Sequence, residues 1–396
     1  MPKFITNLGW GAADVPSGLL FSEIDGSFSG SPHVNPGEYI VPVSVKTNYG
    51  SDAKNIRIVV DDAAYGVYAL GNMAKSWSND AEPDAYGFRK LNIPNASKLN
   101  SIPAGFAAKC VGGQWFISSS SSFTIYGGNG YNYGNVYNVP AAFDCYNVLD
   151  IKGGRMNSSM YFAYMTPDDT TLMGYTKSSN GYSRNFTMSL NNIKMLHKDL
   201  AYGFSVVSQD NQIFTSVLNN TAFNYHTPAF THEKYISKLI SYINSDLSYF
   251  FIDSDGDLFE FSSSKGSDVP EKIFTGVSDV WLRFGGSQVW LLTSDGKLYA
   301  RGSNISYVLG IPDNTQNFND FVYIDNFEAK KIEYCFMLTN DGKLFHTGPA
   351  VSGITSLHNG WTHIFPEYRF QDFSYVPGDA SALGTKTLTV ILKEVL

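Results

Sequence analysis

The apolar and polar positions of this chain repeat one short pattern. An apolar run of strand-forming residues leads into an Asp-Gly or Asp-Asn pair, and an aliphatic residue and then an aromatic residue follow. The clearest copies are residues 289–302 and 335–348, and weaker copies lie at 249–259 and 204–214. Because Asp-Gly and Asp-Asn tolerate positive φ, each copy predicts a tight β-hairpin.

The aliphatic residue after the turn marks each copy of the pattern, and six of the seven markers are followed by an aromatic residue. Most intervals between markers are 40 to 47 residues. A four-stranded sheet of this size cannot bury both faces unless neighbouring sheets stack on it. The repeat therefore predicts an all-β, seven-bladed β-propeller. The markers are Val67, Ile125, Leu172, Ile213, Leu258, Leu298 and Leu344.

The sixth copy resembles the repeats of the regulator of chromosome condensation. The matching segments, in order, are Gly285-Gly286, Leu291-Leu292, Asp295-Gly296, Leu298-Tyr299, Gly302-Ser-Asn304 and Leu309-Gly310. The seventh copy keeps Asp341-Gly342 and Gly348, whereas the turns of the first three copies depart from the pattern; we place the second turn at 119–122. The resemblance covers roughly residues 54–365, and it implies a propeller fold and a binding habit rather than one activity.

The two ends of the chain are the least repeat-like parts. Residues 1–38 combine turn residues with isolated apolar anchors, which predicts a non-blade N-terminal arm, and residues 39–396 are predicted to form the propeller. Strand-forming runs at 38–46 and 385–396 lie outside the repeats. We expect one of them to complete a blade begun at the other terminus, since ring closure removes exposed sheet edges, and the other to dock elsewhere.

Composition favours a well-packed β protein outside the nucleic-acid-binding classes. The 396 residues include 36 Gly, 15% aromatic residues and only 16% charged residues, so Ser, Asn, Thr and Tyr must supply the polar surface. This balance is common in secreted or virion-exposed β proteins. The net charge of −8 without a basic cluster argues against DNA or RNA as a partner.

We expect neither a signal peptide nor a membrane-spanning stretch. Three scattered cysteines, Cys110, Cys145 and Cys335, are predicted to be inert core thiols.

A search for catalytic and metal-binding motifs is mostly negative. The acidic string 253–257 lacks the glycine position and the final carboxylate of a calcium loop, and it is in register with the repeated hairpins. His226 and His232 would need a third ligand from another blade to hold a metal. We therefore expect no catalytic residue, metal site or cofactor. A carbohydrate-active enzyme stays an alternative, because propeller loops can assemble two carboxylates from distant positions.

One segment stands out as a recognition loop. Residues 127–138 consist almost wholly of Gly, Asn and Tyr, the mixture that antibody paratopes use. A second tyrosine-bearing loop, residues 175–184, follows one blade later. The alternative is that these tyrosines pack against the next blade. The predicted binding residues are Tyr131, Tyr133 and Tyr137 in the first loop, and Tyr175 and Tyr182, next to Ser183, in the second.

The remaining aromatic positions divide between core and arm. We expect Trp115, Trp281, Trp290 and Trp361 in the core, and a strand at 233–244 despite its helix-like apolar spacing. Trp10 lies between glycines in the arm and is a candidate anchor in a neighbouring subunit.

These features favour a non-enzymatic structural or binding protein. We expect a phage virion component of the tail or host-attachment apparatus, assembled in the host cytoplasm. Its arm would join other structural proteins in an oligomer or larger assembly, and its propeller loops would bind a cell-surface glycan or protein receptor. The alternative from another class is a soluble regulator or inhibitor that docks one propeller face on a protein partner.

Overall fold

The computed structural model divides the chain into two compact units: unit 1, residues 1–64 with 394–396, and unit 2, residues 65–393. The residues that the structure describes are 9–12, 15, 19–22, 27–30, 37–47, 50–60, 65–79, 81–93, 95–102, 105–111, 113–119, 123–126, 132–136, 141–143, 148–156, 159–167, 170–178, 181–198, 203–219, 222–243, 247–262, 269–283, 288–313, 317–351, 354, 356–376 and 387–393.

Unit 1 is built around a long β-hairpin. Strands β4 (Gly37–Thr47) and β5 (Gly50–Val60) pair antiparallel along their whole length, and β1 (Gly9–Ala12) adds to the other edge of β4. Along β4, Val41 and Val43 are buried while Ile40 is exposed, the alternation of a half-buried strand. Strands β2 (Leu19–Phe21) and β3 (Phe28–Gly30) form a separate hairpin.

The predicted boundary after residue 38 differs from the observed division of the chain. The run that begins at Gly37 pairs with residues 50–60 rather than with a blade, so the division falls after Ala64. Two strands joined by a very short connection lose little chain entropy on pairing, which favours the local hairpin over a partner at the distant C-terminus. Pro42 lies one residue beyond the last pair with β1, where no N–H is needed on that side.

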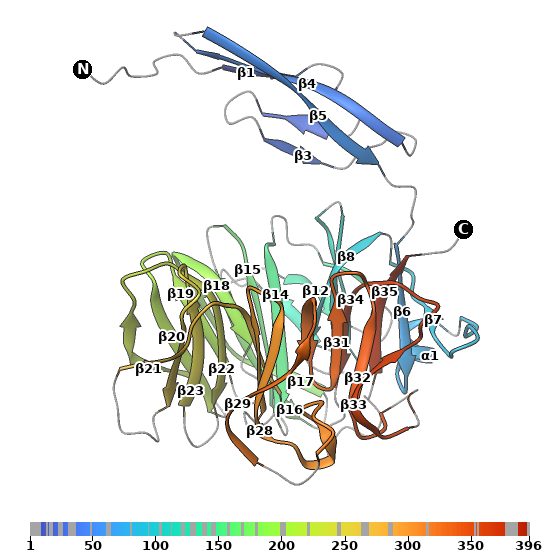
Figure 1. Cartoon of the computed structure of the whole chain (residues 1–396), viewed down its shortest axis with the longest axis vertical. Coiled ribbons are helices and arrows are strands. Elements are labelled where there is room, and N and C mark those ends of the chain that lie inside the picture. Colours follow the sequence, from blue (N-terminus) through green and yellow to red (C-terminus); the bar gives the residue numbers. More distant parts are fainter. Residues whose placement is uncertain are drawn as a thin grey trace. The chain divides into compact units, whose positions relative to one another are not determined.

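Unit 2 consists of successive four-stranded antiparallel sheets, seven of them in the described residues. Colour follows the chain from sheet to sheet in Figure 1. The first four sheets along the chain, after the closing sheet, are β8 (Ala96–Ile102), β9 (Gly105–Cys110), β10 (Trp115–Ser119) and β13 (Ala141–Ala142); β14 (Asp150–Met156), β15 (Ser159–Met165), β16 (Thr170–Ser178) and β17 (Gly181–Leu190); β18 (Ile193–Lys198), β19 (Gly203–Ser208), β20 (Gln212–Asn219) and β21 (Ala222–Thr231); and β22 (Ile236–Ile243), β23 (Leu247–Asp253), β24 (Leu258–Ser262) and β25 (Glu271–Phe274).

Two further sheets and a closing sheet complete the set. Short elements lie in the connections between the third and fourth strands of three sheets: hairpin β11 (Phe123–Tyr126) with β12 (Asn132–Val136), helix α1 (Ala74–Trp77) and the 3₁₀ turn η2 (Ile305–Tyr307). The two further sheets and the closing sheet are β26 (Val277–Leu282), β27 (Gln288–Thr293), β28 (Lys297–Ser303) and β29 (Asn317–Asn326); β30 (Ala329–Glu333), β31 (Phe336–Thr339), β32 (Leu344–Gly348) and β33 (His358–Ile364); and β34 (Phe370–Val376), β35 (Thr387–Lys393), β6 (Tyr65–Gly71) and β7 (Arg89–Lys90).

The first strands of successive sheets contact one another around a ring. β8 contacts β14, and the series continues through β18, β22, β26 and β30; β31 then contacts β34, which returns to β8. This arrangement is the predicted all-β propeller, with the inner strands lining the centre.

The ring is closed by strands from opposite ends of unit 2. β35 lies between β34 and β6, and Thr387 to Lys393 pair residue by residue with Gly71 to Tyr65. In Figure 1 the red β35 lies beside the blue β6. The prediction that one terminal strand completes a blade begun at the other terminus is confirmed for the C-terminal strand.

The core lies between neighbouring sheets and contains the residues that follow the turns. Five of the markers lie in the third strand of a four-stranded sheet and have described side chains, and all five are buried. The aromatic residue after each of them packs at the edge of the core. These buried markers are Val67, Ile213, Leu258, Leu298 and Leu344, all at 0 to 3% exposure.

The second marker, Ile125, is wrong. It lies in β11, outside the four-stranded sheet, and the true equivalent is Trp115, which is 1% exposed. The hairpin turn comes earlier than predicted: Cys110 N–H donates to Gln114 O, as Thr339 N–H does to Lys343 O. Gly113 supplies the positive φ (+86°) that Gly342 supplies in the seventh copy. The sequence has a Gly-Gly pair here in place of Asp-Gly, so the turn did not match the repeat pattern and was placed too late in the chain.

Other core predictions are confirmed where the structure describes them. Residues 236–243 form strand β22, and Trp115, Trp281 and Trp290 are buried, while Trp361 packs at the edge of a core cluster. Cys110 and Cys335 are free buried thiols, and burial raises their pKa to about 11 and about 12. Cys145 lies outside the described residues. No helix in the described ranges has the length and apolar composition of a membrane span.

Candidate functional site

The backbones of the two predicted recognition segments lie near each other in the structure. Tyr133 lies in β12, while Tyr175 and Tyr182 lie on the paired strands β16 and β17. β11, the partner of β12, contacts β17. Tyr131 and Tyr137 lie outside the described residues, as do the side chains of the other three. Their role in binding stays a prediction.

Trp10, the predicted assembly anchor, belongs to a strand rather than to an irregular arm. It lies in β1 opposite Val45 of β4, and its side chain is half-buried. Part of the indole therefore remains open to solvent, and its role in assembly stays a prediction.

The centre of the propeller is lined by lysine–aspartate pairs that join neighbouring inner strands. Three such pairs link six of the seven inner strands: Lys98 with Asp150 at 3.0 Å, Lys238 with Asp279 at 2.7 Å and Lys331 with Asp372 at 3.0 Å. The seventh inner strand, β18, also has a β-bulge after its first residue, but the residue that follows the bulge is Met195 rather than a lysine or an aspartate.

Each aspartate of these pairs is held in the same way. One oxygen accepts a hydrogen bond from the next backbone N–H, at Ile151, Val280 and Phe373. For Asp150, burial disfavours the charged form, but the nearby Lys152 and Lys98 outweigh it and keep its pKa below the usual range. We read the pairs as connections that fix the order of the inner strands, because their groups are largely satisfied by one another.

The acidic string at 253–257 forms a hairpin turn, as predicted. The Oδ1 atom of Asp253 accepts hydrogen bonds from the N–H groups of Asp255 (2.9 Å) and Asp257 (3.0 Å), and Gly256 has φ +79°. His232 Nε2 lies 3.3 Å from the other oxygen of Asp253. The carboxylate thus organises the turn itself, the role that Thr293 and Thr339 play in later copies.

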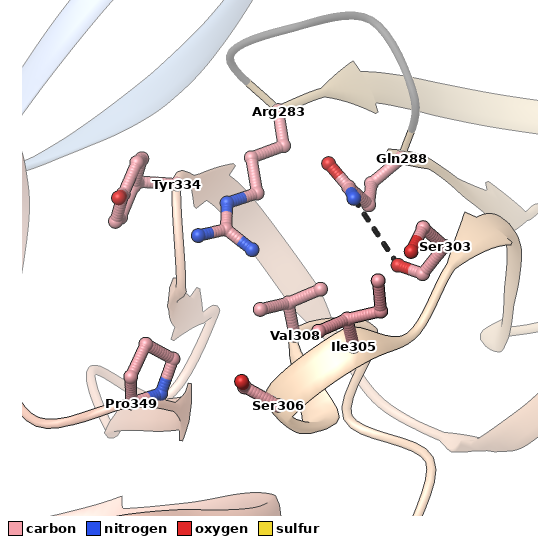
Figure 2. A pocket seen from close by; sticks show the side chains of 8 residues that line it. All are labelled: Arg283, Gln288, Ser303, Ile305, Ser306, Val308, Tyr334 and Pro349. Carbon is pink, nitrogen blue, oxygen red and sulfur yellow. Dashed lines mark hydrogen bonds between the residues drawn. The ribbon is translucent and has the colours of Figure 1, made fainter. Parts of the chain in front are cut away.

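A cavity of about 350 Å³ opens between the sheet of strands β26 to β29 and the sheet of strands β30 to β33. Figure 2 shows the side chains that line it. Arg283 follows β26, Gln288 begins β27, and Tyr334 lies in the turn between β30 and β31. The other lining residues are Ser303, Ile305, Ser306, Val308 and Pro349.

Arg283 dominates the chemistry of this cavity. Its guanidinium carbon lies 4.5 Å from the centre of the Tyr334 ring, a cation–π contact. Its backbone N–H donates to Gln288 O at 3.0 Å, and Gln288 Nε2 donates to Ser303 O at 3.1 Å. In Figure 2 the guanidinium extends from β26 into the space between Tyr334 and Val308. The cavity is therefore a positively charged site with an ordered wall.

The backbone around the cavity is strained. Ser306, Tyr307 and Tyr334 have φ of +59°, +62° and +63°, a region that residues other than Gly and Asn rarely adopt. Strained non-glycine residues gather at functional sites more often than elsewhere. Beneath the cavity, Thr347 Oγ1 donates to Tyr307 O at 2.7 Å and holds this turn in place.

His346, a buried histidine near Arg283, stays neutral. Burial, the neighbouring His358 and the Arg283 charge together lower the pKa of His346 to about 3. Its Nδ1 lies 2.9 Å from His358 Nδ1, so one ring donates to the other. Among the described residues that line the cavity, Arg283 is the one that carries a positive charge.

The Arg283 cavity was missed by sequence reasoning. Its residues lie at 283, 288, 303–308, 334 and 349, in two consecutive repeats, and no motif links them. A weak signal was present, because the charged Arg283 follows the apolar run Val280-Trp-Leu282, two residues before the glycine pair at 285–286.

Comparison with known proteins distinguishes the two units. Residues 6–61 match a sequence family described as "Putative Ig domain". This range falls within unit 1. No curated protein matches the sequence at a significant level.

Solved structures similar to this chain are propellers. Yeast RCC1 (Prp20) bound to Kap60 has a TM-score of 0.59 and 9% identity, over 85% of this chain and 90% of that chain. Prp20p from Saccharomyces cerevisiae, described with its binding properties to Gsp1p and histones, has a TM-score of 0.59 and 9% identity, over 85% and 93% of the two chains. Human WBSCR16 has a TM-score of 0.57 and 12% identity, over 84% and 100%.

At these identities the structural likeness shows the fold alone. The chain thus carries an RCC1-like β-propeller, preceded in sequence by a segment that matches an Ig-type family.

Proposed function

We propose that this chain is a non-enzymatic binding protein in which unit 1 attaches to a larger assembly and the propeller recognises a ligand. The observation that carries the proposal is the organisation in two compact units, one matching an Ig-type family and the other an RCC1-like propeller with a charged cavity. Propeller loops present many side chains on a rigid scaffold, which suits recognition.

The larger assembly that we propose is a phage virion, at its tail or host-attachment apparatus. Support comes from the surface composition, in which Ser, Asn, Thr and Tyr outweigh charged residues, and from the half-buried Trp10 on β1 as a contact for another structural protein. The location in the virion and the host receptor both belong to this proposal.

Solution mass tests the role of unit 1. We would compare the full chain with a chain lacking residues 1–64, using circular dichroism to verify that the β fold survives. The full chain should form a defined oligomer, and the truncated chain a folded monomer. Trp10→Ala should weaken the oligomer, whereas the exposed Ile40→Ala on β4 should not. A folded monomer in every case would contradict self-assembly through unit 1.

The virion location needs a separate measurement. Purified phage particles should contain the chain at a fixed copy number by quantitative mass spectrometry, and an antibody against the propeller should label one end of the tail in electron micrographs. Its absence from washed particles would exclude this location.

A second candidate is a soluble regulator that docks a propeller face on a protein partner. It is favoured by the similarity to yeast RCC1, which is bound to Kap60 in one structure. A monomeric chain, absent from virions, that forms a stoichiometric complex with one protein would favour this function over the first.

A further inference from the structure

Arg283 differs from the other arginines whose side-chain contacts are described. Arg301 forms a bidentate pair with Glu260, at 2.8 and 3.2 Å, and Arg369 donates to two backbone carbonyls. Within the described part of the chain, Arg283 has neither an ion pair nor a side-chain hydrogen bond, and its contact is the Tyr334 ring. A guanidinium has five donors in a planar fork, so this one is suited to an external acceptor.

The guanidinium is also positioned before any ligand arrives. Tyr334 also packs against Tyr375, with ring centres 5.1 Å apart, and its own backbone has φ +63°. Stacking leaves the edge of the guanidinium available, and Figure 2 shows that edge directed into the cavity. A fixed planar fork favours a planar partner such as a carboxylate, which accepts two parallel N–H bonds.

The rest of the lining provides both polar and apolar groups. Gln288, Ser303 and Ser306 bring amide and hydroxyl groups to the lining, and Ile305, Val308 and Pro349 bring aliphatic surface. The cavity of about 350 Å³ is at the small end of ligand sites. A sugar ring with one carboxylate combines these demands: a charge, several hydroxyls and an apolar C–H face.

We propose that the Arg283 cavity binds an acidic sugar residue of a glycan, with the sugar carboxylate bound by the Arg283 guanidinium. The proposal rests on the proposed recognition role of the propeller and names the ligand class. Arg283 is the one charged residue among the described residues that line the cavity, so the site presents a single positive charge, which matches one carboxylate rather than a dianion.

The test compares two sugars that differ only in the charged group. Binding of methyl β-D-glucuronide and methyl β-D-glucoside to the full chain would be measured by ligand-observed NMR titration. The glucuronide should bind at least tenfold more tightly. Arg283→Gln should reduce its affinity to that of the glucoside, and Arg283→Lys should recover only part of the loss, because a lysine lacks the planar fork.

Arg369→Gln is the matched control, because it removes the same charge from an exposed arginine elsewhere. It should leave glucuronide affinity within twofold. Equal binding of the two sugars, or equal effects of the Arg283 and Arg369 substitutions, would overturn the proposal. Circular dichroism would verify that each variant is folded.

Two further outcomes distinguish binding of an acidic sugar from binding of an acidic peptide, and failure of the ligand class from failure of the proposed function. If N-acetyl-glutamate amide binds as tightly as the glucuronide and with the same dependence on Arg283, the assignment to a sugar is overturned in favour of an acidic peptide. If the glucuronide fails to bind while unit 1 still directs assembly, only the ligand class fails and the proposed function stands.

Discussion

At the scale of single residues, Asn304 and Gly310 show why the repeat contains the segments Gly302-Ser-Asn304 and Leu309-Gly310. Asn304 is fully buried; its amide donates to the carbonyls of Ile311 (2.9 Å) and Asp313, and its oxygen accepts from Leu309 N–H at 3.0 Å. Gly310 has φ +81°. Together they fold the loop that forms one wall of the Arg283 cavity.

Gly310→Ala should destabilise the protein more than a positive φ alone explains. A Cβ at Gly310 would lie 2.3 Å from Trp361 Nε1, whereas a Cβ at Gly276, also at positive φ, would meet nothing within 4 Å. We expect a loss of about 3 kcal/mol in unfolding free energy for Gly310→Ala and about 1 kcal/mol for Gly276→Ala. Urea denaturation checks this, and equal losses would contradict the packing argument.

A second residue-scale prediction concerns the pH dependence of stability. The pKa of His346 is lowered from 6.5 to about 3 in the folded chain, so between these values the unfolded chain binds a proton that the folded chain does not. Stability therefore falls as pH falls through this window, by about 1.4 kcal/mol per pH unit from this group.

The variant His346→Gln should remove that contribution. Between about pH 6.5 and 5, above the range where ordinary carboxylates titrate, its unfolding free energy should depend less on pH than that of the parent chain. Parallel curves for the two proteins would show that His346 does not stay neutral on folding.

At the scale of elements, the inner strands depend on the lysine–aspartate pairs. Asp150→Asn would leave Lys98 and the largely buried Lys152 without their carboxylate. We expect a loss of about 3 kcal/mol, chiefly because the largely buried Lys152 charge loses its partner. Asp295→Asn, in an exposed pair with Lys297, should cost far less, because solvent screens the pair. Similar losses in urea denaturation would mean that the inner pairs are screened like surface ones.

At the scale of the whole molecule, the C-terminal strand should be indispensable and unit 1 dispensable for folding of the propeller. β35 lies in the interior of the closing sheet, and its Leu388, Val390 and Ile391 are fully buried. Removing residues 387–396 should abolish cooperative thermal unfolding, while removing residues 1–64 should leave it intact. A cooperative transition in the first truncation would show that the ring tolerates an open sheet.

The sequence by itself determined the repeated unit. Apolar runs, positive-φ turns and the aliphatic–aromatic pair act within one hairpin, so Leu298 and Leu344 could be placed in the strands that follow the turns, and one of the two terminal runs could be expected to close the ring. The error at Ile125 has the same origin, because the Gly-Gly pair at this turn also allows positive φ but lacks the aspartate by which the repeat was identified.

Only the tertiary structure decided which residues meet. The pairing of residues 37–47 with 50–60 placed the division of the chain, and the packing of neighbouring sheets brought Lys331 of β30 to Asp372 of β34. The Arg283 cavity joins two repeats through loops that have no common motif. Contacts between blades depend on the packing of whole sheets, so their partners are set by geometry that no local pattern encodes.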